Sequence, residues 1–181
     1  MGHNLTFAFT SFDRNHLMTD VRPMKQLLKH PIHLFSIGFG AGLIPIAPGT
    51  AGTLVGVVFY ICLQSLSLSW YLPVVAILFT LGIWFCGVTA RTLAVHDHPA
   101  IVWDEIVGFL ITMIAVPTGW GWVLAGFILF RLFDITKPWP IGMIDRRVRG
   151  GIGIMLDDLL AGIYGLASLH LARSLPPLWE S

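Results

Sequence analysis

The chain has 181 residues, of which 55% are hydrophobic and only 12% are charged, and its formal net charge is +1. A mean hydropathy of +0.77 is typical of a membrane protein, and so small a net charge excludes the basic footprint of a nucleic-acid-binding protein. The length fits a single domain.

The first thirty residues are polar and mixed, with no apolar stretch before a small-residue cleavage site. We therefore expect residues 1–30 to be a cytoplasmic extension and expect no cleaved signal peptide. A membrane-embedded domain is predicted over residues 31–175, followed by a short tail at residues 176–181. The first apolar run, residues 32–47, is rich in glycine and ends in prolines. This composition predicts an irregular, re-entrant or interfacial helix.

A glycine-rich turn leads into the second apolar run and reads Pro48-Gly49-Thr50-Ala-Gly52-Thr53. Backbone N–H groups at such a helix start bind anions, and Thr50 and Thr53 are candidate hydroxyl donors to a phosphate. The alternative is that the glycines serve helix packing, since residues 52 and 56 have GxxxG spacing. The turn is not a Walker A loop, because no lysine follows its second glycine.

Three further apolar runs complete the predicted bundle after the one at residues 54–72: residues 74–90, 106–133 and 152–175. The run at 106–133 is too long for one span and is interrupted at Pro117-Thr118-Gly119, which predicts a helical hairpin with short arms. Cys62 and Cys86 both lie in apolar runs. We expect them to be packing residues rather than a disulfide or a metal pair.

Basic and aromatic residues predict the orientation in the bilayer. The turns at residues 64–73 and 117–121 have no basic residue and contain Trp70, Tyr71 and Trp120. Basic residues instead gather before the first run and between residues 131 and 149. Basic loops stay cytoplasmic and aromatic residues line interfaces, so these two segments are expected on the cytoplasmic side.

Five carboxylates lie inside or at the edges of the apolar runs: Asp104, Glu105, Asp134, Asp157 and Asp158. The predicted orientation places all five at the cytoplasmic ends of their helices. A carboxylate near hydrocarbon is costly unless it faces the protein interior, a partner charge or an ion. We therefore predict a shared cation site, and oxygen ligands without a Cys or His cluster favour Mg²⁺ over Zn²⁺. His96 and His98 diverge in a loop and are not expected to bind a metal.

Arg131 and Lys137 flank Asp134 and suit a phosphate, arginine by paired hydrogen bonds and lysine as a point charge. Proline at position 138 predicts that the helix ends near Thr136, so Asp134 lies in its last turn, where the helix dipole opposes a negative charge. Either a metal ion or Arg131 at i,i+3 offsets that charge. The acidic pairs at 104–105 and 157–158 also have a structural alternative, because the dipole stabilises acids at a helix N-terminus.

Four segments together resemble phosphatidylglycerophosphatase A: residues 45–53, 104–108, 131–140 and 155–162, in that order. The resemblance implies a Mg²⁺-dependent lipid phosphatase of the bacterial inner membrane. Such enzymes hydrolyse phosphatidylglycerol phosphate to phosphatidylglycerol and inorganic phosphate. The phospholipid substrate would remain in the bilayer while its headgroup enters a site that faces the cytoplasm.

We therefore predict an all-α, polytopic integral membrane bundle with short or re-entrant helices. The five carboxylates would supply the metal ligands and the catalytic base, while Thr50, Thr53, Arg131 and Lys137 would bind the substrate phosphate. The residues alone leave two alternatives open, a cation-coupled transporter and another lipid phosphomonoesterase or phosphotransferase. They do not define the oligomeric state.

Overall fold

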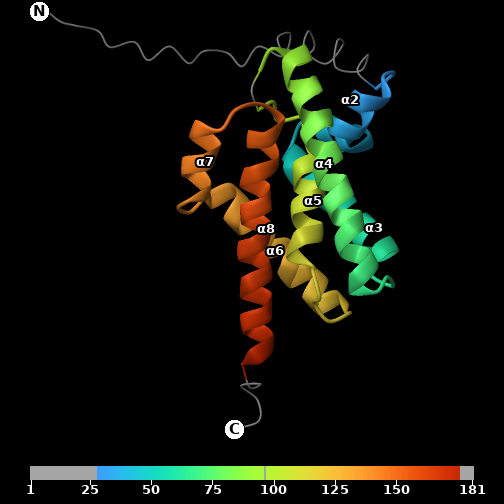
Figure 1. Cartoon of the computed structure of the whole chain (residues 1–181), viewed down its shortest axis with the longest axis vertical. Helices are drawn as coiled ribbons and strands as arrows, with labels where there is room; N and C mark the ends of the chain where they lie inside the picture. The colour runs from blue at the N-terminus through green and yellow to red at the C-terminus, as the bar shows by residue number, and fades with distance from the viewer. Residues whose placement is uncertain (1–27, 96, 176–181) are drawn as a thin grey trace, which may run out of the picture.

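The computed structural model describes residues 28–95 and 97–175, and these residues form helices and no strand (Figure 1). The all-α prediction is therefore confirmed. Most of the predicted extension (residues 1–27) and the whole tail at 176–181 lie outside the described residues. The elements are α2 (Pro31–Ser36), the 3₁₀ helix η1 (Gly38–Leu43), α3 (Pro48–Leu63), α4 (Leu68–Leu93), α5 (Trp103–Thr112), α6 (Trp120–Thr136), α7 (Ile141–Arg147) and α8 (Gly150–Ser174).

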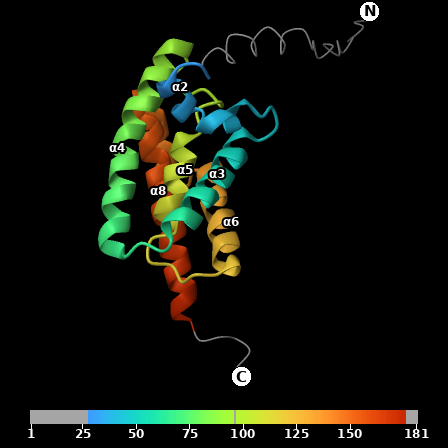
Figure 2. The ribbon, with the colours of Figure 1, turned by 90° about the vertical axis from the view of Figure 1, so that its right-hand side faces the viewer.

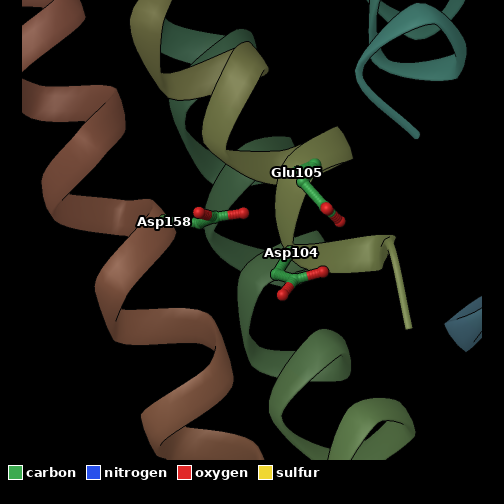
Figure 3. A group of neighbouring side chains, drawn as sticks. All are labelled: Asp104, Glu105 and Asp158. Atoms are coloured by element: carbon green, nitrogen blue, oxygen red, sulfur yellow. The ribbon is translucent and has the colours of Figure 1, made fainter. Parts of the chain in front are cut away.

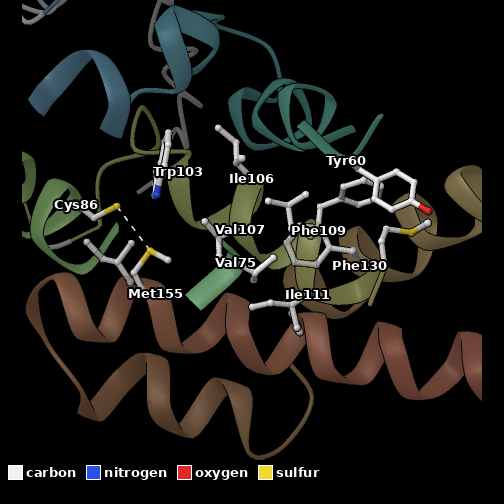
Figure 4. Packing of buried hydrophobic residues seen from close by; sticks show 14 of the residues in the cluster. Tyr60, Val75, Cys86, Trp103, Ile106, Val107, Phe109, Ile111, Phe130 and Met155 are labelled. Carbon is white, nitrogen blue, oxygen red and sulfur yellow. Dashed lines mark hydrogen bonds between the residues drawn. The ribbon is translucent and has the colours of Figure 1, made fainter. Parts of the chain in front are cut away.

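The short helix α5 lies at the centre of the bundle, packed against α3, α4 and α8 (Figure 2). Nine of its ten residues are buried, the exception being the half-buried Glu105. Trp103 and Phe109 of α5 pack against aromatic and sulfur-containing side chains of the neighbouring helices (Figure 4). Ten helical residues extend only about 15 Å, half the thickness of a bilayer's hydrocarbon. The prediction of a short helical arm is confirmed.

Two helices, α4 with 26 residues and α8 with 25, are long and apolar enough to cross a membrane. The shorter helix α3 is also apolar. Large apolar side chains such as Trp70, Ile77 and Leu124 are exposed on the bundle. Exposed apolar surface on this scale is typical of proteins that contact lipid or a protein partner. These features indicate membrane association.

Several helix boundaries agree with those predicted from the sequence, and others differ from them. The hairpin break falls between α5 and α6, and α6 ends at Thr136, both as predicted. The turn expected at residues 64–73 is shorter, because α4 already begins at Leu68 and contains Pro73 in its second turn. The helix α7 was not predicted, because its seven residues are too few to show a clear apolar period.

The first apolar run is irregular, as its glycines and prolines predicted. Its 3₁₀ helix contains Phe39 and Gly40 at positive φ, and Ala47 before α3 is also left-handed. The backbone N–H of Val102 donates to the carbonyl of Ser36 at 3.0 Å, which attaches this run to the segment before α5. The run therefore packs beside the N-terminus of α5.

Candidate active site

The N-terminus of α5, the C-terminus of α6 and the first turns of α8 border a cleft of about 320 Å³. Seven of the nine predicted site residues line it. Six of them come from α5, α6 and α8, and Lys137 directly follows α6. The seven are Asp104, Glu105, Arg131, Asp134, Lys137, Asp157 and Asp158. The structure thus brings together all five carboxylates and both cations that the sequence singled out.

Three of these carboxylates form a compact cluster with unpaired oxygens. One oxygen each of Asp104, Glu105 and Asp158 lie within 4.8 Å of one another (Figure 3). Asp104 Oδ1, Glu105 Oε2 and Asp158 Oδ2 are buried and have no hydrogen-bond partner among the described residues. Buried like charges at this spacing repel one another and lose their hydration. The donor set fits a hard divalent cation, which would supply the missing partner for all three oxygens.

Close approach of α5 and α8 brings Asp158 next to the acidic pair on α5. A Cβ on Gly162 would lie 2.6 Å from the carbonyl oxygen of Gly108. A Cβ on Gly108 would lie 3.0 Å from the carbonyl oxygen of Asp158 and would also overlap the ring of Phe130. Only glycine allows these two backbones to come so near. The acidic cluster therefore depends on residues that carry no functional group.

Arg131 connects the acidic cluster to Asp134. Its Nη1 donates to Asp134 Oδ2, and the same nitrogen lies 3.8 Å from Glu105 Oε1. The i,i+3 pair that the sequence offered as a structural alternative is thus present. Arg131 Nε is buried without a partner among the described residues, so the guanidinium retains a donor for a ligand in the cleft.

Lys137 occupies the left-handed position that ends α6, with φ of 40°, and this turn directs it toward α7 and α8. Its Nζ donates to Asp145 Oδ1 and to Asp157 Oδ2, each at 2.8 Å. Burial lowers the pKa of Lys137, but the two carboxylates outweigh burial and raise its pKa above the usual value. Lys137 is therefore a charged ammonium at neutral pH.

The two predicted threonines do not line this cleft. Thr53 is fully buried and its hydroxyl donates to the carbonyl of Gly49 at 2.9 Å within α3. Gly49 itself lines the cleft, and a Cβ there would collide with Glu105 Oε1 and lie 2.9 Å from Arg131 Nη1. The absence of a side chain at Gly49 thus lets Glu105 and Arg131 pack closely against the start of α3.

Sequence reasoning missed two acidic residues. Asp97 lines the cleft, although its segment was considered only as a histidine site, and His96 lies outside the described residues. Asp145 is the second partner of Lys137. Asp145 directly precedes Arg146 and Arg147, and an acid among these basic residues was a signal available in the sequence.

The family model described as Phosphatidylglycerophosphatase A matches residues 34–173. The chain belongs to the phosphatidylglycerophosphatase A family. It is 45% identical over 152 residues to Phosphatidylglycerophosphatase A of Escherichia coli, covering 83% of this chain and 88% of that protein. It is 47% identical over 152 residues to the protein of the same name from Haemophilus influenzae, covering 82% of this chain and 93% of that protein. The predicted family and enzyme class, a phosphoric monoester hydrolase, are confirmed.

A third relative carries a different name. The chain is 40% identical over 148 residues to a Bacteroides thetaiotaomicron protein named "Putative phosphatidylinositol-3-phosphatase", covering 77% of this chain and 92% of that protein. That name also describes a phosphatase of a lipid phosphomonoester. No solved structure matches the chain.

Proposed function

We propose that this protein is a Mg²⁺-dependent phosphatase that converts phosphatidylglycerol phosphate to phosphatidylglycerol and inorganic phosphate. The observation that carries the proposal is that one cleft is lined both by carboxylates with buried, unpartnered oxygens and by Arg131 and Lys137. The names of the two relatives from Escherichia coli and Haemophilus influenzae support the choice of substrate.

Asp104, Glu105 and Asp158 would hold the Mg²⁺ ion, because their buried oxygens are the hard ligands that this ion prefers. When bound, Mg²⁺ would neutralise negative charge on the phosphoryl group and lower the pKa of a bound water. Zn²⁺ is less suited to this site, because no Cys or His ligand belongs to the cluster.

The chain's own cations would hold the phosphate. Arg131 offers its unpaired Nε, and Lys137 has three N–H donors of which Asp145 and Asp157 accept two. Both cations are held in position by carboxylates that also line the cleft or lie beside it. Positioned charges of this kind stabilise a phosphoryl-transfer transition state without reorganising during the reaction.

Hydrolysis requires a water molecule in line with the bond to the leaving glycerol oxygen. A new P–O bond to the water oxygen forms as the ester P–O bond breaks, and the leaving glycerol oxygen takes a proton from solvent. A cleft carboxylate accepts the proton of the attacking water, and Asp134 and Asp157 are the candidates outside the metal cluster. Gly49, which also lines the cleft, has no side chain that would displace Glu105 and Arg131 from it.

We further infer that the protein lies in the bacterial inner membrane with this cleft at the cytoplasmic face. The end of α4 and the start of α8 lie at the same end of the bundle as the cleft (Figure 1). Arg91, Arg146, Arg147 and Arg149 are at that end, as expected for a cytoplasmic surface. Only the headgroup would leave the lipid layer, while the acyl chains stay against the exposed apolar helices.

The test is phosphate release by the purified protein from phosphatidylglycerol phosphate in detergent, with Mg²⁺ and no nucleotide. Release would separate this function from a transporter and from a phosphotransferase that needs an acceptor. Phosphatidylinositol 3-phosphate should be assayed in parallel, because one relative is named for it. A folded protein that releases no phosphate from phosphatidylglycerol phosphate would contradict the proposal.

A further inference from the structure

A second cavity of about 330 Å³ lies next to the active-site cleft, in the connection between α6 and α8. It is lined by Lys137, Trp139, Gly142, Met143, Arg146 and Arg147. Lys137 lines both the cavity and the cleft, so the two spaces are adjacent at this residue. The helix α7, which supplies most of the lining, packs beside α8 on the outside of the bundle (Figure 1).

The chemistry of this cavity suits an anion. Three of its six lining residues are cations and none is an acid. Arg146 and Arg147 are exposed, so their guanidinium groups can reach a ligand, and guanidinium matches the oxygens of a phosphate group. Trp139 is 78% exposed at the rim, and tryptophan is favoured at the headgroup level of a bilayer.

We propose that this cavity binds the phosphodiester group of the substrate lipid while the terminal phosphomonoester occupies the active-site cleft. This inference rests on the function proposed above. Phosphatidylglycerol phosphate carries its two phosphates on the two ends of one glycerol unit, so they require adjacent anion sites. Lys137 lies where the two spaces meet and would contact the bridge between them.

The arrangement defines a substrate class. A preferred substrate has a phosphodiester between diacylglycerol and a headgroup that bears a phosphomonoester. Phosphatidic acid has its monoester directly on diacylglycerol and no phosphodiester, so it would leave the cavity of Arg146 and Arg147 empty. The cavity therefore selects for the diester-linked headgroup, whereas the cleft performs the hydrolysis.

A competing explanation is that the arginines serve only as cytoplasmic topology signals. Arg149 offers a matched control, because it is exposed in the same connection but does not line the cavity. If the arginines are only topology signals, substituting any of the three should have the same effect on hydrolysis and lipid binding. If the cavity is a phosphodiester site, substituting Arg146 or Arg147 should weaken hydrolysis and lipid binding, whereas substituting Arg149 should not.

The first experiment measures steady-state hydrolysis of short-chain phosphatidylglycerol phosphate and short-chain phosphatidic acid in detergent. R146A and R147A should each lower kcat/KM for phosphatidylglycerol phosphate about tenfold, mainly through KM, as expected for one charge-assisted contact. Hydrolysis of phosphatidic acid by these variants, and of both lipids by R149A, should stay at the wild-type rate. Equal losses on both lipids, or equal losses in all three variants, would overturn the proposal.

The second experiment measures binding without catalysis. Phosphatidylglycerol keeps the phosphodiester and lacks the monoester, so it should bind the full-length protein in EDTA, as measured by native mass spectrometry against diacylglycerol. R147A should weaken this binding about tenfold relative to R149A. Unchanged binding in R147A would overturn the proposal. Phosphatidylglycerol should also compete with the substrate, and failure to compete would instead assign the cavity to a second lipid.

The two experiments separate this inference from the proposed function. If the wild-type protein binds phosphatidylglycerol through Arg147 but does not hydrolyse phosphatidylglycerol phosphate, the proposed reaction fails and the phosphodiester site stands. If hydrolysis proceeds and the arginine variants match wild type in both experiments, the reaction stands and the phosphodiester site fails.

Discussion

The charged residues of the cleft form two halves, which differ in whether their carboxylates are paired with cations of the chain. In the acidic half, formed by Asp104, Glu105 and Asp158, each side chain has a buried oxygen without a partner among the described residues. In the paired half, Arg131 and Lys137 hold Asp134, Asp145 and Asp157 in ion pairs. Both halves lie at the same end of the bundle, and all of their residues except Asp145 line the cleft.

The difference shows two ways of keeping carboxylates in an apolar bundle. The paired half satisfies its charges within the chain, so its geometry should persist without a ligand. In the acidic half, the three buried oxygens without a donor are satisfied only by protons or by a bound cation, and Arg131 approaches only Glu105 Oε1, at 3.8 Å. Metal binding and folding should therefore be coupled in the acidic half alone.

The largest expected effect is that of metal removal. EDTA should abolish phosphate release and lower the thermal midpoint of the protein in detergent, and Mg²⁺ should restore both. The measurement is phosphate release and a thermal melt over a Mg²⁺ titration. Full activity in protein verified to be metal-free would rule out the assigned role of the acidic half.

Substitutions at Asp104 and Asp158 should lower activity but raise thermal stability in the absence of metal, which tests the comparison directly. Asp104→Asn and Asp158→Asn should each lower kcat by about a hundredfold or more, as for lost transition-state charge stabilisation. In EDTA, however, both variants should melt at a higher temperature than wild type, because the unpaired like charges are reduced.

Asp134→Asn is the matched variant from the paired half. It removes the carboxylate partner of Arg131 and should lower the thermal midpoint in EDTA as well as in Mg²⁺. If all three Asn variants shifted the midpoint in the same direction in EDTA, the two halves would not differ as described.

Lys137→Ala should lower kcat/KM for phosphatidylglycerol phosphate by roughly ten- to a hundredfold, the usual effect of losing a charge-assisted contact. Lys29→Ala is the control, since Lys29 is an exposed lysine outside both cavities. Equal kinetic constants in the two variants would place the phosphate away from the paired half.

The smallest effect should come from the cysteines, which belong to neither half. Cys62 is exposed, and Cys86 is buried with its Sγ 4.0 Å from Met155 Sδ. The double variant Cys62→Ala, Cys86→Ala should retain most phosphate release and should be insensitive to thiol alkylation. Loss of turnover in a well-folded double variant would indicate a thiol nucleophile instead of attack by water.

The candidate site was largely predictable because charged residues are scarce in this chain. Each acid at the edge of an apolar run had to face a partner or an ion, and the positions of the basic residues predicted that all five share one end of the bundle. The roles of Thr50 and Thr53 in phosphate binding stay predictions. Neither threonine belongs to the cleft lining. A threonine at a helix start can turn its hydroxyl to its own backbone, as Thr53 does, and sequence does not distinguish the two uses.

The sequence by itself determined the all-α class, the hairpin break, the end of α6 at Thr136 and seven of the eight charged residues that line the cleft. These features follow from local rules, namely apolar run length, proline geometry and the cost of charge near hydrocarbon. Only the tertiary structure decided which carboxylates are paired and which are not. That division depends on the approach of α5 to α8 at Gly108 and Gly162 and on the turn that directs Lys137 toward Asp145 and Asp157. Distances between helices that are far apart in sequence set the electrostatics of the site, and no local pattern encodes them.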